Sequence, residues 1–464
     1  GVLVIGPNRV FLRYIEQVLP SLGEAGVEQV VLADLVPGHR IGVIDTNAAK
    51  RVKGDIRMAK VIAKAVQDRQ RPVRDDVEIP YGAGYMRLRA TESARIVRDA
   101  RRRFRRHNAA HRFVETEVIS AMIASSRNPD ADVDTLRDSL RDIPEFRATL
   151  ARIWPMLVPA ELLHDLFGSA ALVKSAAKDE FSAEEYECLV RTRSNSIAEV
   201  LWSDSDVALL DEALALLGPR PRKNGKIDET DEMRVFGHIV IDEVQDLTPM
   251  QLRMASRRSL SGAMTVVGDL AQATGPFAPN DWSDLLQYLP TKREQEVIGL
   301  TVGYRIPAQI MALADKVMLE AAPSLRAPKS VREGDFGPDI VEAKSGKDLL
   351  DVVIEQAKIL LTNVGEGNVA IVCPDDMTDA IDSALTAAGV AHGRANTTAL
   401  DSRLTVVPVS VVKGLELDGV LVVEPARIVA SQVHGLRSLY VALTRSTQRL
   451  TVVHSEPLPR SMQS

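Results

Sequence analysis

Short apolar runs recur along the chain and predict buried β-strands. They occur at residues 2–5, 30–32, 239–241, 264–267, 369–372, 404–409, 420–423 and 450–453. Most of these runs lack the alternation of a half-exposed strand. Such a pattern is typical of strands buried on both faces, as in a parallel sheet that helices cover.

Apolar residues at helical spacing fill several of the intervals between these runs. Residues 11–22 and 308–319 are examples. Strands that alternate with helices favour βαβ units and an open parallel sheet. The pattern therefore predicts an α/β fold.

Residues 88–234 break this alternation, because they contain no comparable apolar run. The segment is rich in Arg, Ala, Leu and Glu, and the prolines at positions 144, 155, 159 and 219 mark helix ends. Apolar residues repeat at helical spacing in residues 96–123, 145–154, 183–191 and 207–217. We predict an all-helical insertion within the first α/β lobe, followed by a polar exit linker at residues 219–232.

Length and composition point to a protein of several domains in a reducing cytoplasm. The 464 residues are too many for one hydrophobic core, and the hydrophobic content of 45% is ordinary for a globular protein. No apolar run approaches the roughly 20 residues that span a bilayer, and no signal peptide is visible. The two cysteines, Cys188 and Cys373, are far apart, which argues against a disulfide framework or a zinc site.

The charge balance limits the role of nucleic acid. The formal net charge is −6 and aromatic residues make up only 4% of the chain. A protein that mainly grips nucleic acid would usually be basic and carry stacking rings. Any contact with nucleic acid should therefore be local, or the main partner is a protein.

The strongest chemical signal is a pair of acids after the apolar run at 239–241. Asp242 and Glu243 would lie at the carboxyl end of a strand, where α/β sheets bind ligands. Asp242 would hold Mg²⁺ through water, and Glu243 would act as general base toward an attacking water. Strands often end in acids, so a solvated strand end is the alternative for this motif alone.

A second strand end follows at residues 264–272, and it carries Gly268, Asp269 and Gln272. The amide of Gln272 both donates and accepts hydrogen bonds, so it could sense a γ-phosphate and the attacking water. A Gly-Asp pair is also a common turn. Two such strand ends close in sequence make chance a weaker explanation.

Three further segments carry an aromatic residue, a carboxylate and two arginines. They contain Tyr304 and Arg305, Gly414 and Glu416, and Arg445 at the end of a predicted helix. A guanidinium group answers the charge that builds on a γ-phosphate during transfer, and such an arginine contributes roughly 10³–10⁵ in rate. For either arginine alone, a surface ion pair is the alternative.

Together these segments resemble the motifs of superfamily 1 helicases of the UvrD/Rep type, in order and spacing, over residues 1–85 and 235–464. The resemblance implies two RecA-like lobes, ATP and Mg²⁺. The implied domains are the first lobe at 1–87 and 235–297, the helical insertion at 88–234 and the second lobe at 298–464. It also implies roles for the site residues: Asp242 as Mg²⁺ ligand, Glu243 as base, Gln272 as γ-phosphate sensor, Arg305 and Arg445 on the γ-phosphate, Tyr304 on the adenine, Glu416 on the ribose, and Gln245 and Gly414 beside the nucleotide.

A narrower resemblance is to the HelD-like members of this group, which associate with RNA polymerase. Residues 6–20, 52–55, 209–213 and 248–253 carry it. It implies a monomer that binds the RNA polymerase core, uses ATP to free it from DNA or dead-end complexes, and sends its helical insertion into the polymerase's main channel. The alternatives are a UvrD-like DNA translocase and a polymerase-occluding factor with weak ATPase activity.

Two departures from the superfamily pattern bear on activity. The 464 residues contain no G-x-x-x-x-G-K-[ST] phosphate loop, and we expect that loop to lie before residue 1. We therefore expect this chain alone to hydrolyse ATP poorly. In residues 273–279 the aromatic and Arg-Gly-Ala group that UvrD-type helicases use to stack single-stranded DNA is missing or moved, which argues against strand separation.

The predicted insertion holds two charge clusters, and each has two interpretations. The first cluster would contact nucleic acid or an acidic polymerase surface, or is a solvated helix face. The second would approach the polymerase's catalytic Mg²⁺ or mimic nucleic-acid charge, or is a loop with a helix N-cap. The first consists of Arg95, Arg98, Arg101, Arg102, Arg103, Arg105, Arg106 and Arg112, and the second of Asp130, Asp132, Asp134, Asp138 and Asp142.

Overall fold

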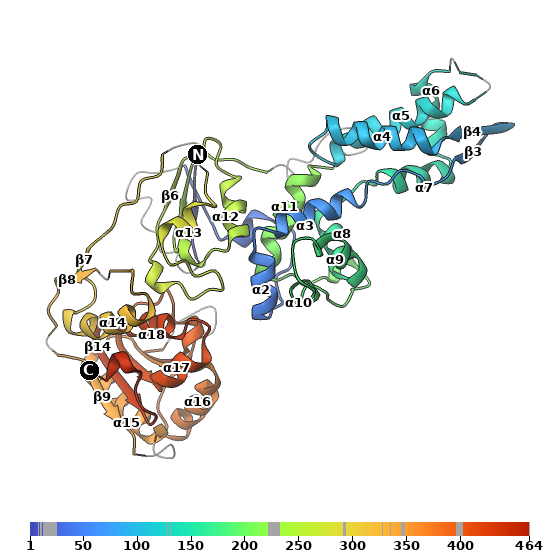
Figure 1. The fold of residues 1–464 in the computed structure, drawn as a ribbon. Helices are drawn as coiled ribbons and strands as arrows, with labels where there is room; N and C mark the ends of the chain where they lie inside the picture. The colour runs from blue at the N-terminus through green and yellow to red at the C-terminus, as the bar shows by residue number, and fades with distance from the viewer. Residues whose placement is uncertain are drawn as a thin grey trace. The chain divides into compact units, whose positions relative to one another are not determined.

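The computed structural model describes two compact units (Figure 1). Unit 1 consists of residues 1–29, 240–247 and 262–464, and unit 2 consists of residues 30–239 and 248–261. The predicted helix at 11–22 and most of the exit linker lie outside the described residues. The described residues are 1–7, 9, 12, 26–126, 128–129, 131–220, 233–290, 294–326, 328–334, 336–344, 349–395 and 402–463.

A six-stranded sheet forms the centre of the C-terminal part of unit 1, and all its neighbouring strands are parallel. The predicted strands at 369–372, 404–409, 420–423 and 450–453 all lie in it. The two outermost strands, β11 and β9, are short and were not predicted. The strand order is β11 (Gly393–Arg394), β12 (Leu404–Pro408), β10 (Val369–Cys373), β13 (Leu417–Val423), β14 (Ser446–His454) and β9 (Asp339–Glu342).

Both faces of this sheet are covered, which explains its continuous apolar runs. Val420 and Val422 pack on one side with α14 (Ala308–Ala321), α17 (Pro425–Ser431) and α18 (Gly435–Leu443). Leu421 and Val423 pack on the other side with α15 (Leu349–Val364) and α16 (Thr378–Ala387). Alternate residues of one strand therefore serve two separate cores.

A second sheet, most of whose residues belong to unit 1, has the order β2-β1-β5-β6. The strands are β1 (Val2–Ile5), β2 (Val27–Val30), β5 (His238–Ile241) and β6 (Met264–Val266). The predictions at 2–5, 239–241 and 264–267 are confirmed. The prediction at 30–32 was wrong at its end, because β2 stops at Val30 and a 3-10 turn occupies Leu32–Leu35. Unit 1 also contains α13 (Trp282–Leu286) and a small parallel pair, β7 (Val302–Gly303) with β8 (Lys329–Ser330).

One of the two hydrophobic cores of unit 2 surrounds α11 (Asp204–Leu217). The other helices that contribute to it or pack against it are α2 (Asn47–Gly54), α3 (Met58–Gln67), α8 (Pro159–Phe167), α9 (Ala170–Ala177), α10 (Ala183–Glu187) and α12 (Pro249–Ser256). Two buried ionic networks tie α11 to its neighbours. Lys53 of α2 contacts Asp206 at 2.8 Å, and Arg253 of α12 contacts Glu212 at 2.8 Å.

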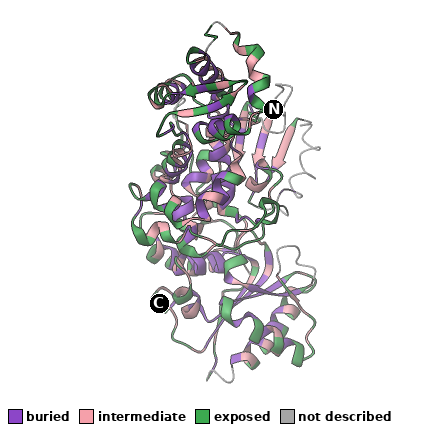
Figure 2. Cartoon of the chain, turned by 90° about the vertical axis from the view of Figure 1, so that its right-hand side faces the viewer, coloured by how far each residue is buried: buried purple, intermediate pink, exposed green. Residues whose placement is uncertain are grey.

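The second core of unit 2 joins an antiparallel hairpin to four helices. The hairpin, β3 (Val77–Tyr81) and β4 (Gly84–Leu88), was not predicted. The helices are α4 (Ala90–Arg103), α5 (His111–Ala124), α6 (Val133–Arg141) and α7 (Pro144–Ile153). The helical spacing predicted over 96–123 is interrupted, because Phe104 is extended and ends α4. Figure 2 shows that buried residues gather in the interior and exposed residues along the outer edges.

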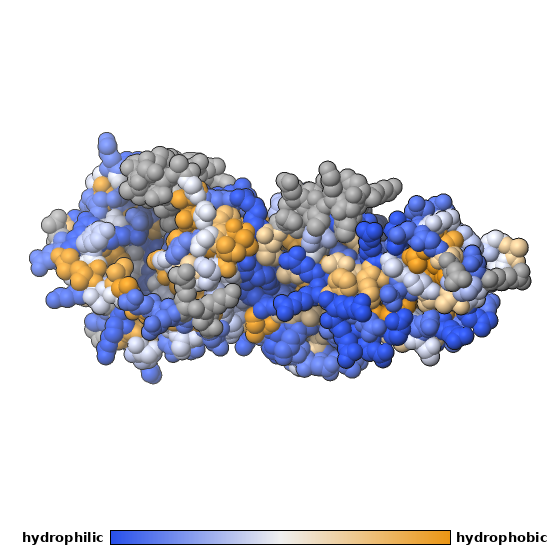
Figure 3. Space-filling view, turned by 90° about the horizontal axis from the view of Figure 1, so that it is seen from above, coloured by the Kyte–Doolittle hydropathy of each residue, from blue (hydrophilic) through white to orange (hydrophobic). Residues whose placement is uncertain are grey.

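The prediction of a mixed α/β fold with parallel strands and many helices is confirmed. The RecA-like nature of two lobes, the helical insertion within the first lobe and the domain boundaries at 87, 234 and 297 stay predictions. None of the helices in the described ranges is long and apolar enough to cross a membrane. On the face seen in Figure 3, apolar residues form separate patches within a mainly hydrophilic surface.

Candidate functional site

Two acidic side chains stand directly after β5, held by an unusual backbone. The Asp242 backbone N–H donates to the Ile5 carbonyl at 3.1 Å, which extends the sheet by one residue. Glu243 then adopts a left-handed conformation with φ of 50°, and its N–H donates to the Asp242 carboxylate at 2.9 Å. A non-glycine residue in this conformation costs about 1–3 kcal/mol, and such strain clusters at functional sites.

The electrostatics of this turn favour a bound cation. Burial raises the pKa of Asp242, and the negative charge of the neighbouring Glu243 raises it further. Burial also raises the pKa of Asp246, although the ammonium of Lys413 opposes that change. Carboxylates that are costly to ionise in the free protein gain most from a nearby cation. Mg²⁺ is commonly held by one or two carboxylates together with substrate phosphates, and the Asp242 carboxylate suits that role.

Gln245 links the ends of β5 and β6 in the four-stranded sheet. Its side chain is almost fully buried; its amide donates to Glu243 at 2.5 Å, and its carbonyl oxygen accepts the Asp269 N–H at 3.1 Å. Gly268 makes this contact feasible, because a Cβ there would lie 2.2 Å from the Gln245 Oε1. The side chain of Gln272 is oriented in turn by Asp269, to which it donates at 2.7 Å.

Lys413 brings a positive charge to the acidic turn, and sequence reasoning did not select it. It lies in the turn between β12 and β13, whose Gly414 has φ of 79°. Its ammonium is 2.5 Å from Asp246 and 3.5 Å from Glu243, and it donates to the Gln272 carbonyl at 2.8 Å. The sequence did offer one sign of its role, because Lys413 directly precedes Gly414, which was predicted to lie beside the nucleotide.

Arg445, just after α18, meets Gln272. Its guanidinium donates to the Gln272 Oε1 at 2.8 Å and to the Val441 carbonyl at 3.0 Å. Burial and then the nearby positive charge of Arg305 lower the pKa of Arg445, while the charge of Glu243 acts in the opposite direction. The structure thus brings Glu243, Gln272 and Arg445 together from three distant segments of unit 1.

Arg305 pairs with Glu416 at 2.7 Å, on the same side as Arg445. Within the described residues, its Nε and Nη2 are buried and have no hydrogen-bond partner. Unpaired buried donors are costly, and an anion would satisfy them. Tyr304 is not part of this contact network, since its side chain is 80% exposed.

The residues present fit a triphosphate with Mg²⁺. Carboxylates that can hold a cation and unpaired guanidinium donors that can hold an anion lie within one network. No group of three or more His, Cys, Asp or Glu residues suited to a metal occurs in the described part of the chain. A cation shared between one or two carboxylates and a phosphate does not need such a group.

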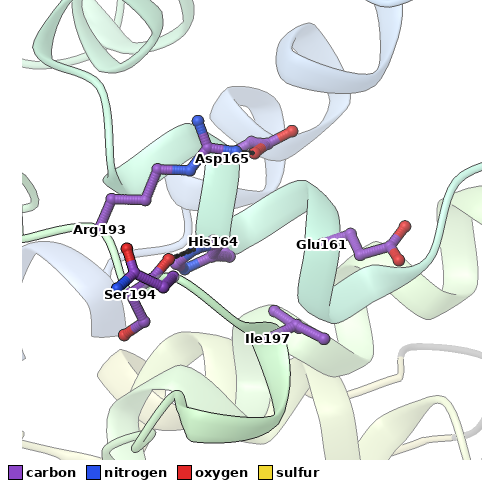
Figure 4. Close-up of a pocket in the computed structure, with 7 residues that line it drawn as sticks. Glu161, His164, Asp165, Arg193, Ser194 and Ile197 are labelled. Carbon is purple, nitrogen blue, oxygen red and sulfur yellow. Dashed lines mark hydrogen bonds and ion pairs between the residues drawn. The ribbon is translucent and has the colours of Figure 1, made fainter.

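Unit 2 contains a separate polar pocket with a volume of about 530 Å³ (Figure 4). It holds none of the predicted site residues. Arg193 pairs with Asp165 at 2.6 Å, and His164 contacts the Ser194 carbonyl at 3.1 Å. These polar groups therefore satisfy one another, which leaves little demand for a ligand.

Sequence comparison connects the chain with UvrD-like helicases. No protein-family model matches it. It is 27% identical over 285 residues to the ATP-dependent DNA helicase UvrD2 of Mycobacterium bovis, and equally to UvrD2 of two Mycobacterium tuberculosis strains. The match covers 59% of this chain and 38% of those relatives, so the chain spans well under half of their length. The chain is thus similar to UvrD-like helicases, whereas the HelD-like resemblance stays a prediction.

Comparison with solved structures gives only distant similarities. The C-terminal domain of a possible DNA helicase from Lactobacillus plantarum WCFS1 has a TM-score of 0.29 and 24% identity, covering 35% of this chain and 92% of that one. Arterivirus nonstructural protein 10, a helicase in complex with DNA, has a TM-score of 0.27 and 15% identity, covering 47% of this chain and 40% of that one. TM-scores this low do not establish a shared overall fold.

Proposed function

We propose that this protein is a UvrD-like, superfamily 1 nucleic-acid motor that hydrolyses ATP with Mg²⁺ at the network around Glu243. One observation carries the proposal. Acidic and amide side chains that follow β5 and β6 of the four-stranded sheet lie close to the guanidinium groups of Arg305 and Arg445, and two buried donors of Arg305 lack a partner among the described residues. That combination suits a ligand with both a cation and a polyanion.

The residues divide the chemistry as follows. Asp242 would hold Mg²⁺, which when bound screens phosphate charge. Glu243 would accept a proton from the attacking water, in a position fixed by the 2.5 Å hydrogen bond from Gln245. Arg305 and Arg445 would neutralise the charge that develops on the γ-phosphate. Gln272 contacts Arg445 directly, so it can report the state of the phosphate to the sheet.

The test is Mg²⁺-dependent ATP hydrolysis by the full-length protein. Glu243→Gln should lower kcat about 100-fold or more, because a general base is lost. Arg445→Lys should lower it about 1,000-fold or more, because an ammonium cannot replace the planar guanidinium. The binding of a fluorescent ATP analogue should survive in Glu243→Gln.

Matched controls come from positions of unit 1 outside the site, Glu355 being exposed and Arg427 half-buried in an ion pair with Asp376. Glu355→Gln on α15 and Arg427→Lys on α17 change the same residue types outside the site and should leave kcat unchanged. Wild-type turnover in Glu243→Gln would contradict the proposed role of that residue.

For the substrate of the motor, we propose the RNA polymerase core, on the strength of the HelD-like segments. The protein would bind the polymerase through its helical unit and use ATP to release it from DNA or stalled complexes. Co-purification of polymerase and ATP-dependent release would support this. Release without nucleotide would instead indicate an occluding factor with weak ATPase activity.

The similarity to UvrD2 favours a second candidate, a DNA translocase. DNA-stimulated ATPase activity in the absence of polymerase would support it. Because residues 273–279 lack the usual stacking group, we expect weak or no strand separation on a forked duplex.

A further inference from the structure

The arginines in and around α4 give unit 2 a surface with a large positive net charge. Residues 89–112 contain nine arginines, no lysine and two acids, Glu92 and Asp99, which gives a formal net charge of +7. The whole chain carries −6. This segment is therefore a local reversal of the protein's charge.

Contacts within unit 2 account for only some of these arginines. Arg95 uses the nearby acids, Asp99 at 3.4 Å and Glu117 at 3.3 Å. Arg101 donates to Gln70 at 2.8 Å, and Arg103 lies over the Phe113 ring at 4.9 Å. These three arginines have clear structural roles.

Arg98, Arg102, Arg105 and Arg112 are different. All four are exposed, and none makes a side-chain hydrogen bond or ion pair with another described residue. Arg98 and Arg102 are four residues apart on α4, a spacing at which like charges repel. The helix dipole favours arginines in the last turn, but that does not explain Arg98, Arg105 or Arg112.

The side chains on this basic surface indicate which class of partner it would bind. Protein interfaces usually have an apolar or aromatic centre, yet between residues 73 and 154 of the described chain Tyr85 is the only large hydrophobic residue that is exposed. A surface that offers mainly guanidinium groups suits an anion that needs little apolar contact. Arginine matches phosphate oxygens in a bidentate manner, which favours phosphate over scattered carboxylates.

We propose that the exposed arginines of this basic surface, Arg98, Arg102, Arg105 and Arg112, bind the phosphate backbone of nucleic acid without regard to sequence. The site lies in unit 2 and is separate from the nucleotide site. It deepens the proposed nucleic-acid motor by naming a contact surface in unit 2, and it does not require ATP hydrolysis. Its affinity must fall steeply with salt, because each phosphate contact releases counterions.

The test measures binding of a labelled mixed-sequence duplex, about 20 base pairs long, by the full-length protein at several salt concentrations without ATP. The triple variant Arg98→Gln, Arg102→Gln, Arg105→Gln should bind at least about tenfold more weakly near 0.1 M salt. The slope of log K against log salt should shrink by about 3, since each lost contact removes roughly 0.9.

The matched control removes three other exposed arginines of unit 2, with Arg74→Gln, Arg147→Gln and Arg152→Gln, whose side chains also have no partner among the described residues. It should bind like the wild type. No duplex binding by the wild type, an unchanged triple variant or an equally weakened control would each overturn the proposal. So would competition by poly-L-glutamate as effective as that by DNA at equal charge, because the surface would then suit acidic proteins.

The two proposals fail separately. Glu243→Gln should leave duplex binding intact, and the triple variant should leave basal ATP hydrolysis intact. Circular dichroism of the triple variant should match the wild type, since the three exposed side chains make no hydrogen bond or ion pair with another described residue.

Discussion

At the residue scale, the acidic turn depends on a lysine that no motif rule selected. Asp246 and Glu243 share the ammonium of Lys413, and Asp246 is partly buried. Lys413→Ala would leave two neighbouring carboxylates without their cation. We expect the free energy of unfolding to fall by about 1–3 kcal/mol, measured by urea denaturation.

The comparison for this lysine is Lys60→Ala in unit 2, which breaks a more exposed pair with Glu180. Exposed ion pairs contribute about 0–1 kcal/mol. If both variants lose the same stability, the ion pairs of Lys413 add nothing beyond a surface contact.

Position 268 has to be glycine, because any side chain there would clash with Gln245. In Gly268→Ala the new methyl group would displace Gln245, which orients Glu243. We expect kcat for ATP hydrolysis to fall about tenfold or more, because positioning within the site is lost. Gly299→Ala, where no atom lies within 4 Å of the added Cβ, should keep wild-type kcat.

The residue types of the site were predictable, but their pairing was not. Asp242, Glu243, Gln272 and Arg445 stand out because apolar runs or helical spacing precede them. The Lys413 contacts and the clash that requires Gly268 depend on the approach of distant segments. No local pattern encodes such an approach.

At the element scale, strands were predictable where both faces are buried. The runs at 369–372 and 420–423 are continuous because alternate side chains enter different cores. β7, β8 and β11 have only two residues each, with no run to detect. The hairpin of β3 and β4 turns through Gly82 with φ of 59°, and its strands expose every second residue.

The acidic segment before α6 shows a local rule outweighing a functional hypothesis. Asp132 is the N-cap of α6, and its carboxylate accepts from the Thr135 N–H at 2.9 Å. Asp134 forms an ion pair with Arg137. The helix-cap interpretation is confirmed for Asp132, while Asp130 lies outside the described residues.

The junction between α4 and α5 contains a buried, neutral histidine side chain, His107, which predicts that stability depends on pH. His107 stacks on Trp154, contacts the Pro155 carbonyl at 2.6 Å and meets Gln70 at 3.0 Å. These contacts suit an imidazole that donates from Nε2 and accepts at Nδ1. Burial lowers the pKa of His107 to about 4.

The sign of the effect follows from that depressed pKa. Between pH 6.5 and about 4 the unfolded chain takes up a proton that the folded chain refuses, so stability falls as pH falls. The loss would reach about 3 kcal/mol at most. In His107→Gln the free energy of unfolding should change less across this window. An unchanged pH dependence would contradict a neutral, buried His107.

At the scale of the whole molecule, the proposed nucleotide site has no phosphate loop within the 464 residues. They carry the carboxylates and arginines proposed for catalysis, but no G-x-x-x-x-G-K-[ST] sequence. We expect these 464 residues, purified by themselves, to turn over ATP at least about 100-fold more slowly than a median enzyme. Turnover near the roughly 10 s⁻¹ of a median enzyme would contradict this.

The bond from Lys413 to Gln272 spans 141 positions of sequence. A ribosome adding about 5–20 residues per second needs roughly 7–28 s to cover that interval. The Gln272 carbonyl of a nascent chain must wait that long for the Lys413 ammonium, and Asp246 of the acidic turn, which lies earlier in the sequence, must wait longer. The acidic turn therefore cannot reach its final contacts until Lys413 has been synthesised.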